Sequence, residues 1–300
     1  MRPLASIIIP IAPYHYTAVD TALDSAYAQD APCEVIPMYD SREQGAAYTR
    51  NAGAAKAQAP FLVFLDADDV LAPDFVSATV ERWLAGDKRN TYIYTDWTIP
   101  DGRVRYANED FDILKGGMAH IITTLLPRQA FEYVGGFDTT MQGGEDEDLY
   151  IRLQIAGLCP KRLPRPLVNY RLNLGQSATS PHFNPHYETF VKQHQENMIA
   201  KYGRYASMCC GSSVVATGQI ANEQFEGAVQ VEALYPPRTE VGVVSGKKYP
   251  RVGHGTTLWV DKRDVQAKPG LWKIIQDSTP IAPDVDFVLQ LAQTAKQRTA

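Results

Sequence analysis

The sequence predicts an α/β protein in which a larger first domain precedes a small β-rich domain. The runs SIIIP (residues 6–10) and FLVFL (61–65) are short and entirely apolar, as strands buried on both faces of a parallel sheet are. Segments with helical spacing of apolar residues lie between the strands and are joined to them by short links. From about residue 212, short β-rich runs alternate with turn signals instead. We therefore expect a βαβ-type domain over residues 1–210 and a second domain over residues 211–300.

The elements of the first domain follow from apolar periodicity and from residues that start or end helices. Ala18, Ala22 and Ala26 repeat at helical spacing, and Pro73 and Gly86 stand where a helix would begin and end. In chain order, the predicted strands lie at 6–10, 33–40, 61–65 and 91–97, and the predicted helices lie at 17–30, 44–59, 73–86, 145–157 and 184–203.

The second domain is predicted to be a small antiparallel barrel or sandwich. Its β-rich runs are SSVVAT, AVQVEALY, EVGVVSG and TTLWVD. Turn signals such as Pro236-Pro237 and Ser245-Gly246 separate these runs. A terminal helix from about Asp284 is predicted to close the chain.

Composition argues against several classes of protein. The formal net charge of -5 gives no general attraction to nucleic acid or to anionic membranes, although it does not exclude a local basic groove. The 4 cysteines include no CxxC pair, so neither a zinc site nor a disulfide framework is supported. The N-terminal apolar run is too short for a signal peptide, and no window approaches the ~20 apolar residues of a membrane span. We expect a soluble, cytoplasmic protein that does not bind membranes.

Three carboxylates follow the strand predicted at 61–65: Asp66, Asp68 and Asp69. Ligands of parallel α/β sheets bind at the carboxyl ends of the strands, where two such carboxylates can face one hard cation. Mg²⁺ and Mn²⁺ accept carboxylate oxygens together with phosphate oxygens, so the stretch fits a divalent ion that carries a nucleotide diphosphate. It also fits a helix N-terminus, where aspartate stabilises the helix dipole without a metal.

A second acidic cluster, GGEDED, opens the helix predicted at 145–157. A helix dipole explains acids at this position, but the two preceding glycines also allow the backbone to approach a ligand closely. A carboxylate beside a metal-bound diphosphate can act as a general base. Arg50, near the start of an earlier helix, can pair with a phosphate or can be an ordinary surface arginine.

The order of these segments resembles that of the inverting nucleotide-sugar glycosyltransferases of family two, which have the GT-A (Rossmann-like) fold. The resemblance spans about residues 4–172. It implies transfer of a hexose from a nucleotide diphosphate sugar, such as a UDP-sugar, to an acceptor hydroxyl with inversion at the anomeric carbon. The segments that carry it are SIIIP, YDS, RNAG, FLDADD, VGGFD and GEDEDLYIRL.

The resemblance also implies roles for particular residues. Pro10, Asp40 and Arg50 would bind the nucleotide, with Asp40 at the base. Asp66 and Asp68 are similar to the DXD pair of the family, with Asp66 near the ribose and Asp68 on Mn²⁺ or Mg²⁺.

The second acidic cluster receives its role from the same resemblance. Asp146 would be the base that deprotonates the acceptor hydroxyl, and Glu145 would be its neighbour. The hydroxyl would attack opposite the leaving diphosphate, while the metal neutralises the departing charge.

The sequence departs from the family pattern in two places. Only residues 41–49 separate the second strand from the RN segment, which trims the nucleotide pocket. Asn173 also stands where the family often has a histidine that binds the metal. Either Asn173 supplies an oxygen, or His182 or His186 reaches the metal, or the metal is held more loosely; we assign the role to His182.

Two other classes of protein remain as alternatives. VFLDADDVL resembles the first motif of haloacid-dehalogenase-type phosphatases, in which the first aspartate is a nucleophile, although that motif normally opens the chain. A non-catalytic nucleotide-binding module is the other alternative. Hydrolysis of phosphomonoesters would support the first, and tight diphosphonucleotide binding without turnover would support the second.

The acceptor is predicted only by the C-terminal region. VGVVSGKKYPRVGHGTTLWVDKRDV resembles small β-rich proteins of tailed bacteriophages, which implies a viral enzyme acting in the host cytoplasm. A 5-hydroxymethyl pyrimidine in duplex DNA is then one expected acceptor, and a saccharide or small-molecule hydroxyl is the other. Lys247, Lys248, Arg251, Lys262 and Arg263 form either a nucleic-acid-binding strip or a solvated face.

Overall fold

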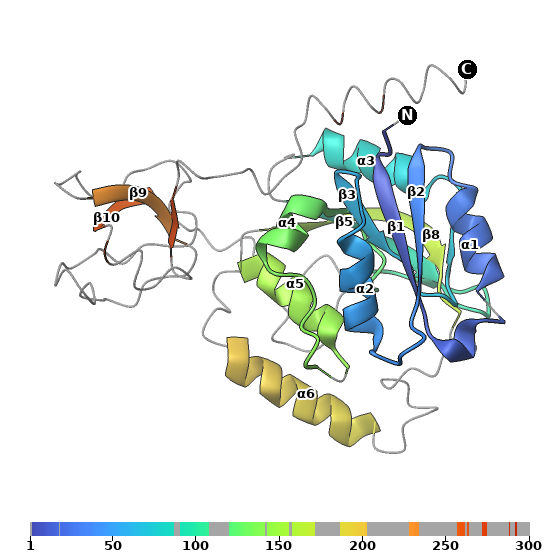
Figure 1. The fold of residues 1–300 in the computed structure, drawn as a ribbon. Coiled ribbons are helices and arrows are strands. Elements are labelled where there is room, and N and C mark those ends of the chain that lie inside the picture. The colour runs from blue at the N-terminus through green and yellow to red at the C-terminus, as the bar shows by residue number, and fades with distance from the viewer. Residues whose placement is uncertain are drawn as a thin grey trace.

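The computed structural model describes most of the first 202 residues and several short segments beyond them (Figure 1). It has α/β architecture, as predicted, and its larger part contains two mixed four-stranded sheets. The described residues are 2–17, 19–86, 91–107, 120–141, 143–155, 158–171, 187–202, 228–233, 257–261, 263, 272–274, 288 and 292.

The first sheet has the strand order β2-β1-β3-β7. Strand β1 (Ala5–Ile11) runs parallel to both β2 (Cys33–Tyr39) and β3 (Phe61–Phe64). The short β7 (Leu126–Pro127) is antiparallel to β3. Because β1, β2 and β3 are parallel, their carboxyl ends meet at one edge, and the loops that follow all three begin there.

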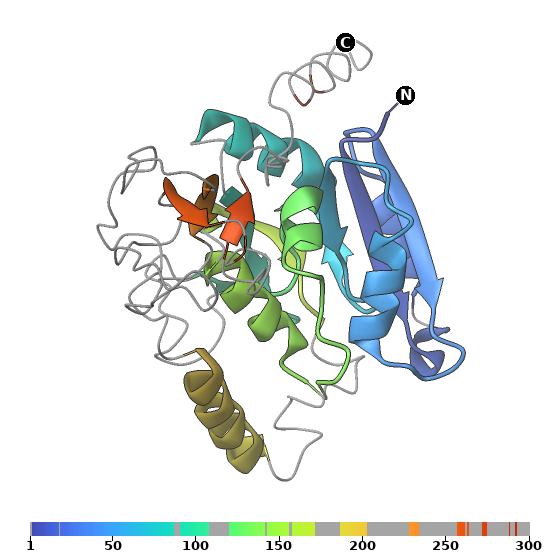
Figure 2. The same cartoon turned by 60° about the vertical axis from the view of Figure 1, so that its left-hand side comes forward.

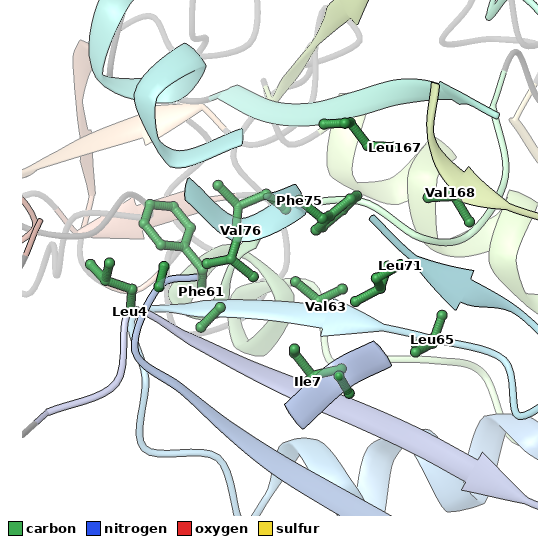
Figure 3. Close-up of a cluster of buried hydrophobic side chains, with 14 of the residues drawn as sticks. Leu4, Ile7, Phe61, Val63, Leu65, Leu71, Phe75, Val76, Leu167 and Val168 are labelled. Carbon is green, nitrogen blue, oxygen red and sulfur yellow. The ribbon is translucent and has the colours of Figure 1, made fainter. Parts of the chain in front are cut away.

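Both faces of this sheet are buried, which explains the uninterrupted apolar runs of β1 and β3. Ile7 and Ile9 pack into one core, while Ile8, which points the opposite way, packs into another. The first core contains α1 (Asp20–Tyr27) and α3 (Phe75–Ala85), and Figure 3 shows its apolar side chains between sheet and helix. The second contains α2 (Ala46–Ala54), α4 (Arg128–Tyr133) and α5 (Glu145–Ile155). In Figures 1 and 2, α2, α4 and α5 lie on the same side of the strands.

The second sheet has the order β4-β8-β5-β6, and most of it was not predicted. Strand β5 (Thr91–Thr98) matches the predicted strand at 91–97, and β8 (Cys159–Asn169) runs parallel to it. Strands β4 (Val70–Leu71) and β6 (Val104–Arg105) are short and antiparallel to their neighbours.

Strand β8 was missed because its sequence, CPKRLPRPLVN, contains three prolines, which usually argue against a strand. Only its last residues pair on both sides, since β4 covers Val168 and Asn169 alone. The register with β5 also shifts beside Asp96, where a regular ladder is interrupted. Prolines are therefore tolerated along the part of this strand that is paired on one side only.

The predicted helices are present, but with shorter bounds. The helix predicted at 44–59 ends at Ala54, and the one predicted at 73–86 begins only at Phe75. The short helices α4 and η1 (Pro13–His15), a 3-10 turn directly after β1, were not predicted. Helix α6 (Tyr187–Tyr202) contacts α5 through Lys201, whose Nζ lies 2.7 Å from Asp148.

The C-terminal region contains an antiparallel sheet of three described strands in the order β10-β9-β11. Strands β9 (Ala228–Ala233) and β10 (Thr257–Asp261) agree with two of the predicted runs, and β11 is Trp272–Ile274. The remaining predicted runs, the domain boundary at 210 and most of the terminal helix lie outside the described residues. The barrel-like second domain therefore stays a prediction. No helix in the described part of the chain has the length and hydropathy that a membrane span requires.

Gly53 allows α2 to pack closely on β1, and this contact generates our first prediction. A Cβ at Gly53 would lie 2.5 Å from Cγ2 of Ile8 and 3.0 Å from Cγ of Met38. The overpacking cost of about 1–3 kcal/mol exceeds the helix-propensity gain of about 1 kcal/mol. Gly53→Ala is therefore expected to lower the midpoint of urea unfolding. Gly86→Ala, where a Cβ would meet nothing closer than 3.6 Å, is the matched control. An unchanged midpoint for Gly53→Ala would contradict this packing.

Candidate functional site

The predicted site residues come from separate loops and helices that meet at the carboxyl edge of the first sheet. Asp40 follows β2, Asp66 and Asp68 follow β3, and Arg50 lies on α2. Glu145 and Asp146 begin α5, which lies on the same side of the sheet as α2. These elements bring Arg50 into contact with Glu145, 95 positions later in the chain.

Arg50 is the centre of this arrangement. Its guanidinium is buried, and it donates from Nη2 to Asp66 Oδ1 at 2.7 Å and from Nη1 to Glu145 Oε1 at 2.8 Å. Its Cζ also lies 5.4 Å from the centroid of the Phe137 ring. The alternative of a surface arginine is therefore wrong. The nucleotide contact expected of Arg50 stays a prediction, since both terminal nitrogens are occupied by carboxylates.

Asp40 organises the loop that leads into α2. Its two carboxylate oxygens each accept a hydrogen bond of 2.8 Å, one from the backbone N–H of Gln44 and one from that of Gly45. Gly45 has a φ of 91°, a left-handed conformation that glycine adopts readily. This compact loop replaces the longer segment of the family pattern. A contact between Asp40 and the nucleotide base remains a prediction, as does the contact expected of Pro10 near the end of β1.

The carboxylates after β3 do not cap a helix. The next helix, α3, has Asp74 at its N-cap position, and β4 lies between Asp69 and that helix. The helix-dipole explanation for Asp66 and Asp68 is therefore wrong. Asp69 is fully buried, and one of its carboxylate oxygens accepts a hydrogen bond of 3.0 Å from the backbone N–H of Arg171. Burial raises the pKa of the Asp69 carboxyl well above its usual value.

Asp66 and Asp68 remain oriented towards the site. Burial, followed by the negative charge of Asp66, raises the pKa of the Asp68 carboxyl. The Nε2 atom of His15 lies 4.0 Å from Oδ2 of Asp68. Neither ring nitrogen of His15 has a hydrogen-bond partner, although the residue is only 9% exposed. His15 was not predicted as a site residue, since a lone histidine after a strand carries no distinctive signal.

The second acidic cluster divides into two functional halves. Asp148 is fully buried and pairs with Arg152 of its own helix and with Lys201 of α6, so its role is structural. The other half consists of Glu145 and Asp146. Glu145 pairs with Arg50, whereas Asp146 has no ion-pair partner in the described residues. Gly143 and Gly144 have φ values of 105° and 72°, and their left-handed conformations form the tight entry into α5.

Asp146 has the properties of a general base. Burial first, and the charge of Glu145 second, raise the pKa of its carboxyl to about 6, while Arg50 acts in the opposite direction. The negative charge of Asp66 also contributes, which shows that the two acidic loops act on one another electrostatically. A carboxylate with a pKa of about 6 is ionised at neutral pH and still accepts a proton readily.

Tyr170, just after β8, is a further residue that sequence reasoning missed. Burial raises the pKa of its hydroxyl, and Asp66, Asp69, Asp68 and Asp146 raise it further. The hydroxyl therefore lies within the electrostatic influence of both acidic clusters. Its position depends on β8, which the prolines concealed in the sequence.

The donor atoms around Asp68 fit a divalent cation, although they are too few to form a complete metal site. Within the described part of the chain, no group of three or more histidine, cysteine, aspartate or glutamate side chains is arranged to hold a metal. Magnesium and manganese often bind through one or two carboxylates and complete their coordination with phosphate oxygens. Asp68 and the unpartnered imidazole of His15 suit such an ion. His182, His186 and Asn173, which we considered as further ligands, lie outside the described residues.

The comparison with protein families adds an independent observation. Residues 17–146 match the model for the family described as Glycosyl transferase family 2. This segment, which is less than half of the chain, is similar to glycosyl transferase family 2 domains. It contains Asp40, Arg50, Asp66 and Asp68 and ends at Asp146, the acid predicted from the resemblance to be the base.

Curated relatives of the domain have similar names. An uncharacterized glycosyltransferase of Rickettsia prowazekii (strain Madrid E) is 24% identical over 188 residues, which cover 50% of this chain and 58% of the relative. An uncharacterized glycosyltransferase of Rickettsia typhi (strain ATCC VR-144 / Wilmington) is 23% identical with the same coverage. The chain thus spans little more than half the length of these relatives.

Solved structures of S. aureus TarS are also similar to this chain. The crystal structure of TarS 1-349 in complex with UDP-GlcNAc matches with a TM-score of 0.48 and 14% identity, covering 68% of this chain and 72% of TarS 1-349. The complex with UDP matches with a TM-score of 0.45 and 13% identity, covering 70% and 73%.

Asn51 fixes the loop beneath Arg50 and generates a second prediction. Its side-chain amide donates to the carbonyl of Phe137 and accepts from the N–H of the same residue, both at 2.9 Å. Asn51→Asp retains the acceptor but places a carboxylate against that carbonyl, which should destabilise the protein by about 1–3 kcal/mol in urea unfolding. Asn169→Asp, at an exposed position on β8, is the control. Equal unfolding midpoints for the two variants would refute the role of Asn51.

Proposed function

We propose that this protein is a metal-dependent, inverting glycosyltransferase that moves a hexose from a UDP-sugar to an acceptor hydroxyl. The observation that supports this most strongly is the double ion pair of Arg50. It joins Asp66, the acid assigned to the donor, to Glu145, the neighbour of the acid assigned to the base. Both acids lie within the segment that matches the glycosyl transferase family 2 model.

The proposed reaction uses Asp146 as the general base. The acceptor oxygen attacks the anomeric carbon of the donor sugar, and its proton passes to a carboxylate oxygen of Asp146. The bond from the anomeric carbon to the diphosphate oxygen breaks as the new bond forms on the opposite face, which inverts the configuration. A divalent cation near Asp68, when bound, neutralises charge on the departing diphosphate.

The assignment of Asp146 rather than Glu145 follows from their partners. Glu145 accepts a charged hydrogen bond of 2.8 Å from Arg50, so its carboxylate is already engaged by that partner. The side chain of Asp146 instead accepts a hydrogen bond of 2.9 Å from the backbone N–H of Glu147 and has no ion-pair partner among the described residues. Its raised pKa also matches the requirement of a base that works near neutral pH.

Tyrosines at the mouth of the site suit a nucleotide. Tyr14 is 55% exposed, and Asp68, Asp66 and Asp40 all raise the pKa of its hydroxyl in addition to burial. Tyr16 and Tyr39 are exposed, and their rings meet edge to face at 5.5 Å. Exposed aromatic faces beside carboxylates that bind a nucleotide provide surfaces on which a base can stack.

For the acceptor we propose two classes, which the same experiment separates. One is a 5-hydroxymethyl pyrimidine in duplex DNA, in line with the predicted phage origin, and the other is a saccharide or small-molecule hydroxyl. The basic residues predicted to contact DNA fall almost entirely outside the described part of the chain. Transfer to DNA would weaken steeply as salt is added, because phosphate contacts release counterions.

A transfer assay tests the proposed function. The protein is incubated with a panel of sugar nucleotides and Mn²⁺, with hydroxymethylcytosine DNA or oligosaccharides as acceptors, and the products are identified by mass spectrometry. Asp146→Asn is expected to reduce transfer at least about a hundredfold while donor binding persists, since only the proton acceptor is lost. Asp101→Asn, at an exposed acid outside the site, is the control.

Three outcomes would count against parts of this proposal. Near-normal turnover of Asp146→Asn would remove Asp146 as the base. Hydrolysis of simple phosphomonoesters without any requirement for a sugar nucleotide would favour a phosphatase. Tight binding of UDP without transfer or hydrolysis of any donor would favour a non-catalytic module.

The pH dependence of transfer provides a further prediction. Because the base must be ionised and its pKa is about 6, kcat/KM should fall about tenfold for each pH unit below that value. Glu145→Gln removes the neighbouring charge that raises this pKa, so the acid limb should move to lower pH. The limb of Asp101→Asn should coincide with that of the wild type. An acid limb that Glu145→Gln leaves in place would show that another group controls it.

A further inference from the structure

We propose that His15 is a ligand of the divalent cation and, together with Asp68, forms a two-residue cation site that the donor diphosphate completes. This inference rests on the proposed function, since it requires that a nucleotide diphosphate bind beside Asp68. His15 lies just before the segment that matches the glycosyl transferase family 2 model.

The first reason is the unusual state of the His15 side chain. The residue is 9% exposed, yet neither Nδ1 nor Nε2 has a hydrogen-bond partner. Buried polar atoms normally have a partner, and an unpaired one costs roughly 1–3 kcal/mol. An imidazole nitrogen without a partner, beside a carboxylate, is therefore suited to a ligand that comes from outside the chain.

The second reason is the distance to Asp68. The gap of 4.0 Å between His15 Nε2 and Asp68 Oδ2 is too long for a hydrogen bond. Two ligands about 2.0–2.1 Å from the same ion lie about 4.1 Å apart when they are opposite and about 2.9 Å apart when they are at right angles. One ion can therefore reach both atoms after little or no movement of the side chains.

The third reason is that the backbone fixes where His15 points. Pro13 begins the 3-10 turn η1, and the N–H of His15 donates to the carbonyl of Ala12 at 2.9 Å. The carbonyl of His15 accepts from the N–H of Val19 at 3.0 Å, and the Tyr14 ring packs edge-on at 4.3 Å. These contacts hold the imidazole beside the loop after β3.

Two protein ligands are fewer than a stable metal site requires, and this determines how the ion binds. No larger group of ligating side chains exists in the described residues, and in our proposal diphosphate oxygens and water fill the remaining positions. The cation should therefore bind weakly alone and much more tightly with UDP. A nitrogen ligand should also favour Mn²⁺ over Mg²⁺, because imidazole suits softer divalent ions than carboxylate does.

Pulsed EPR of Mn²⁺ bound to the full-length protein with UDP tests this inference directly. The expected spectrum of the wild type contains a hyperfine coupling to nitrogen that changes when the protein is labelled with ¹⁵N-histidine. His15→Gln should remove this coupling and weaken Mn²⁺ binding in the presence of UDP at least about tenfold. His194→Gln, on α6, is the matched control and should retain both the coupling and the affinity. His182→Gln tests the alternative ligand. Asp68→Ala should weaken Mn²⁺ binding as well.

The outcomes separate this inference from the proposed function. If wild-type protein binds Mn²⁺ with UDP but shows no histidine nitrogen coupling, His15 is not a ligand and the proposed function is unaffected. If the coupling disappears in His182→Gln and persists in His15→Gln, the ligand is His182. If the wild type binds neither UDP nor Mn²⁺ with UDP, the proposed function fails and the inference fails with it. The wild-type spectrum decides the first question even if His15→Gln does not fold, and thermal melting of each variant detects such a failure.

Discussion

The site depends on one buried positive charge, the guanidinium of Arg50. An arginine removed from water is costly unless carboxylates surround it, and losing one member of such a group leaves an uncompensated charge. Asp66 and Glu145 provide the compensation at 2.7 and 2.8 Å. Asp66 lies in the loop after β3 and Glu145 begins α5, far apart in the chain, so the requirement to neutralise Arg50 also fixes where these two segments meet. In our proposal, the loop after β3 binds the donor and the start of α5 activates the acceptor.

The charges around Arg50 do not balance, and this imbalance is the physical basis on which we propose a bound cation. Arg50 is matched by Asp66 and Glu145, while Asp68 and Asp146 stand nearby without an equally close basic partner in the described residues. The pKa values of Asp68 and Asp146 are raised because it costs free energy to hold several negative charges together in a partly buried environment. A divalent ion beside Asp68 would lower that cost, and a diphosphate would then find a positive centre in an otherwise acidic pocket. The same surroundings keep the pKa of Asp146 high enough for proton transfer.

Much of the fold was predictable because its signals are local. The alternation of Ile7, Ile8 and Ile9 between two cores follows from an apolar run too short for a helix, and the βαβ order follows from its spacing. The second sheet was not predictable, because the prolines of β8 disguise a strand that is paired on one side for most of its length. The candidate site residues were named through a family resemblance, and their roles stay predictions. Their contacts could not be predicted, since an alanine-rich helix such as α2 gives no sign that Arg50 is buried against Glu145, 95 positions later.

Helix α2 shows how a few adjacent residues can hold such a site rigidly. Arg50 makes the two ion pairs, and Asn51 holds the backbone of Phe137, whose ring lies against the Arg50 guanidinium. Gly53 lacks a side chain and so lets the helix rest directly on β1. A side chain on a helix that is packed this closely has little freedom to move, whereas an arginine on a loop would change position whenever the loop did. Asp66 and Glu145 therefore take their positions from α2, and in our proposal one helix sets the separation between donor and base.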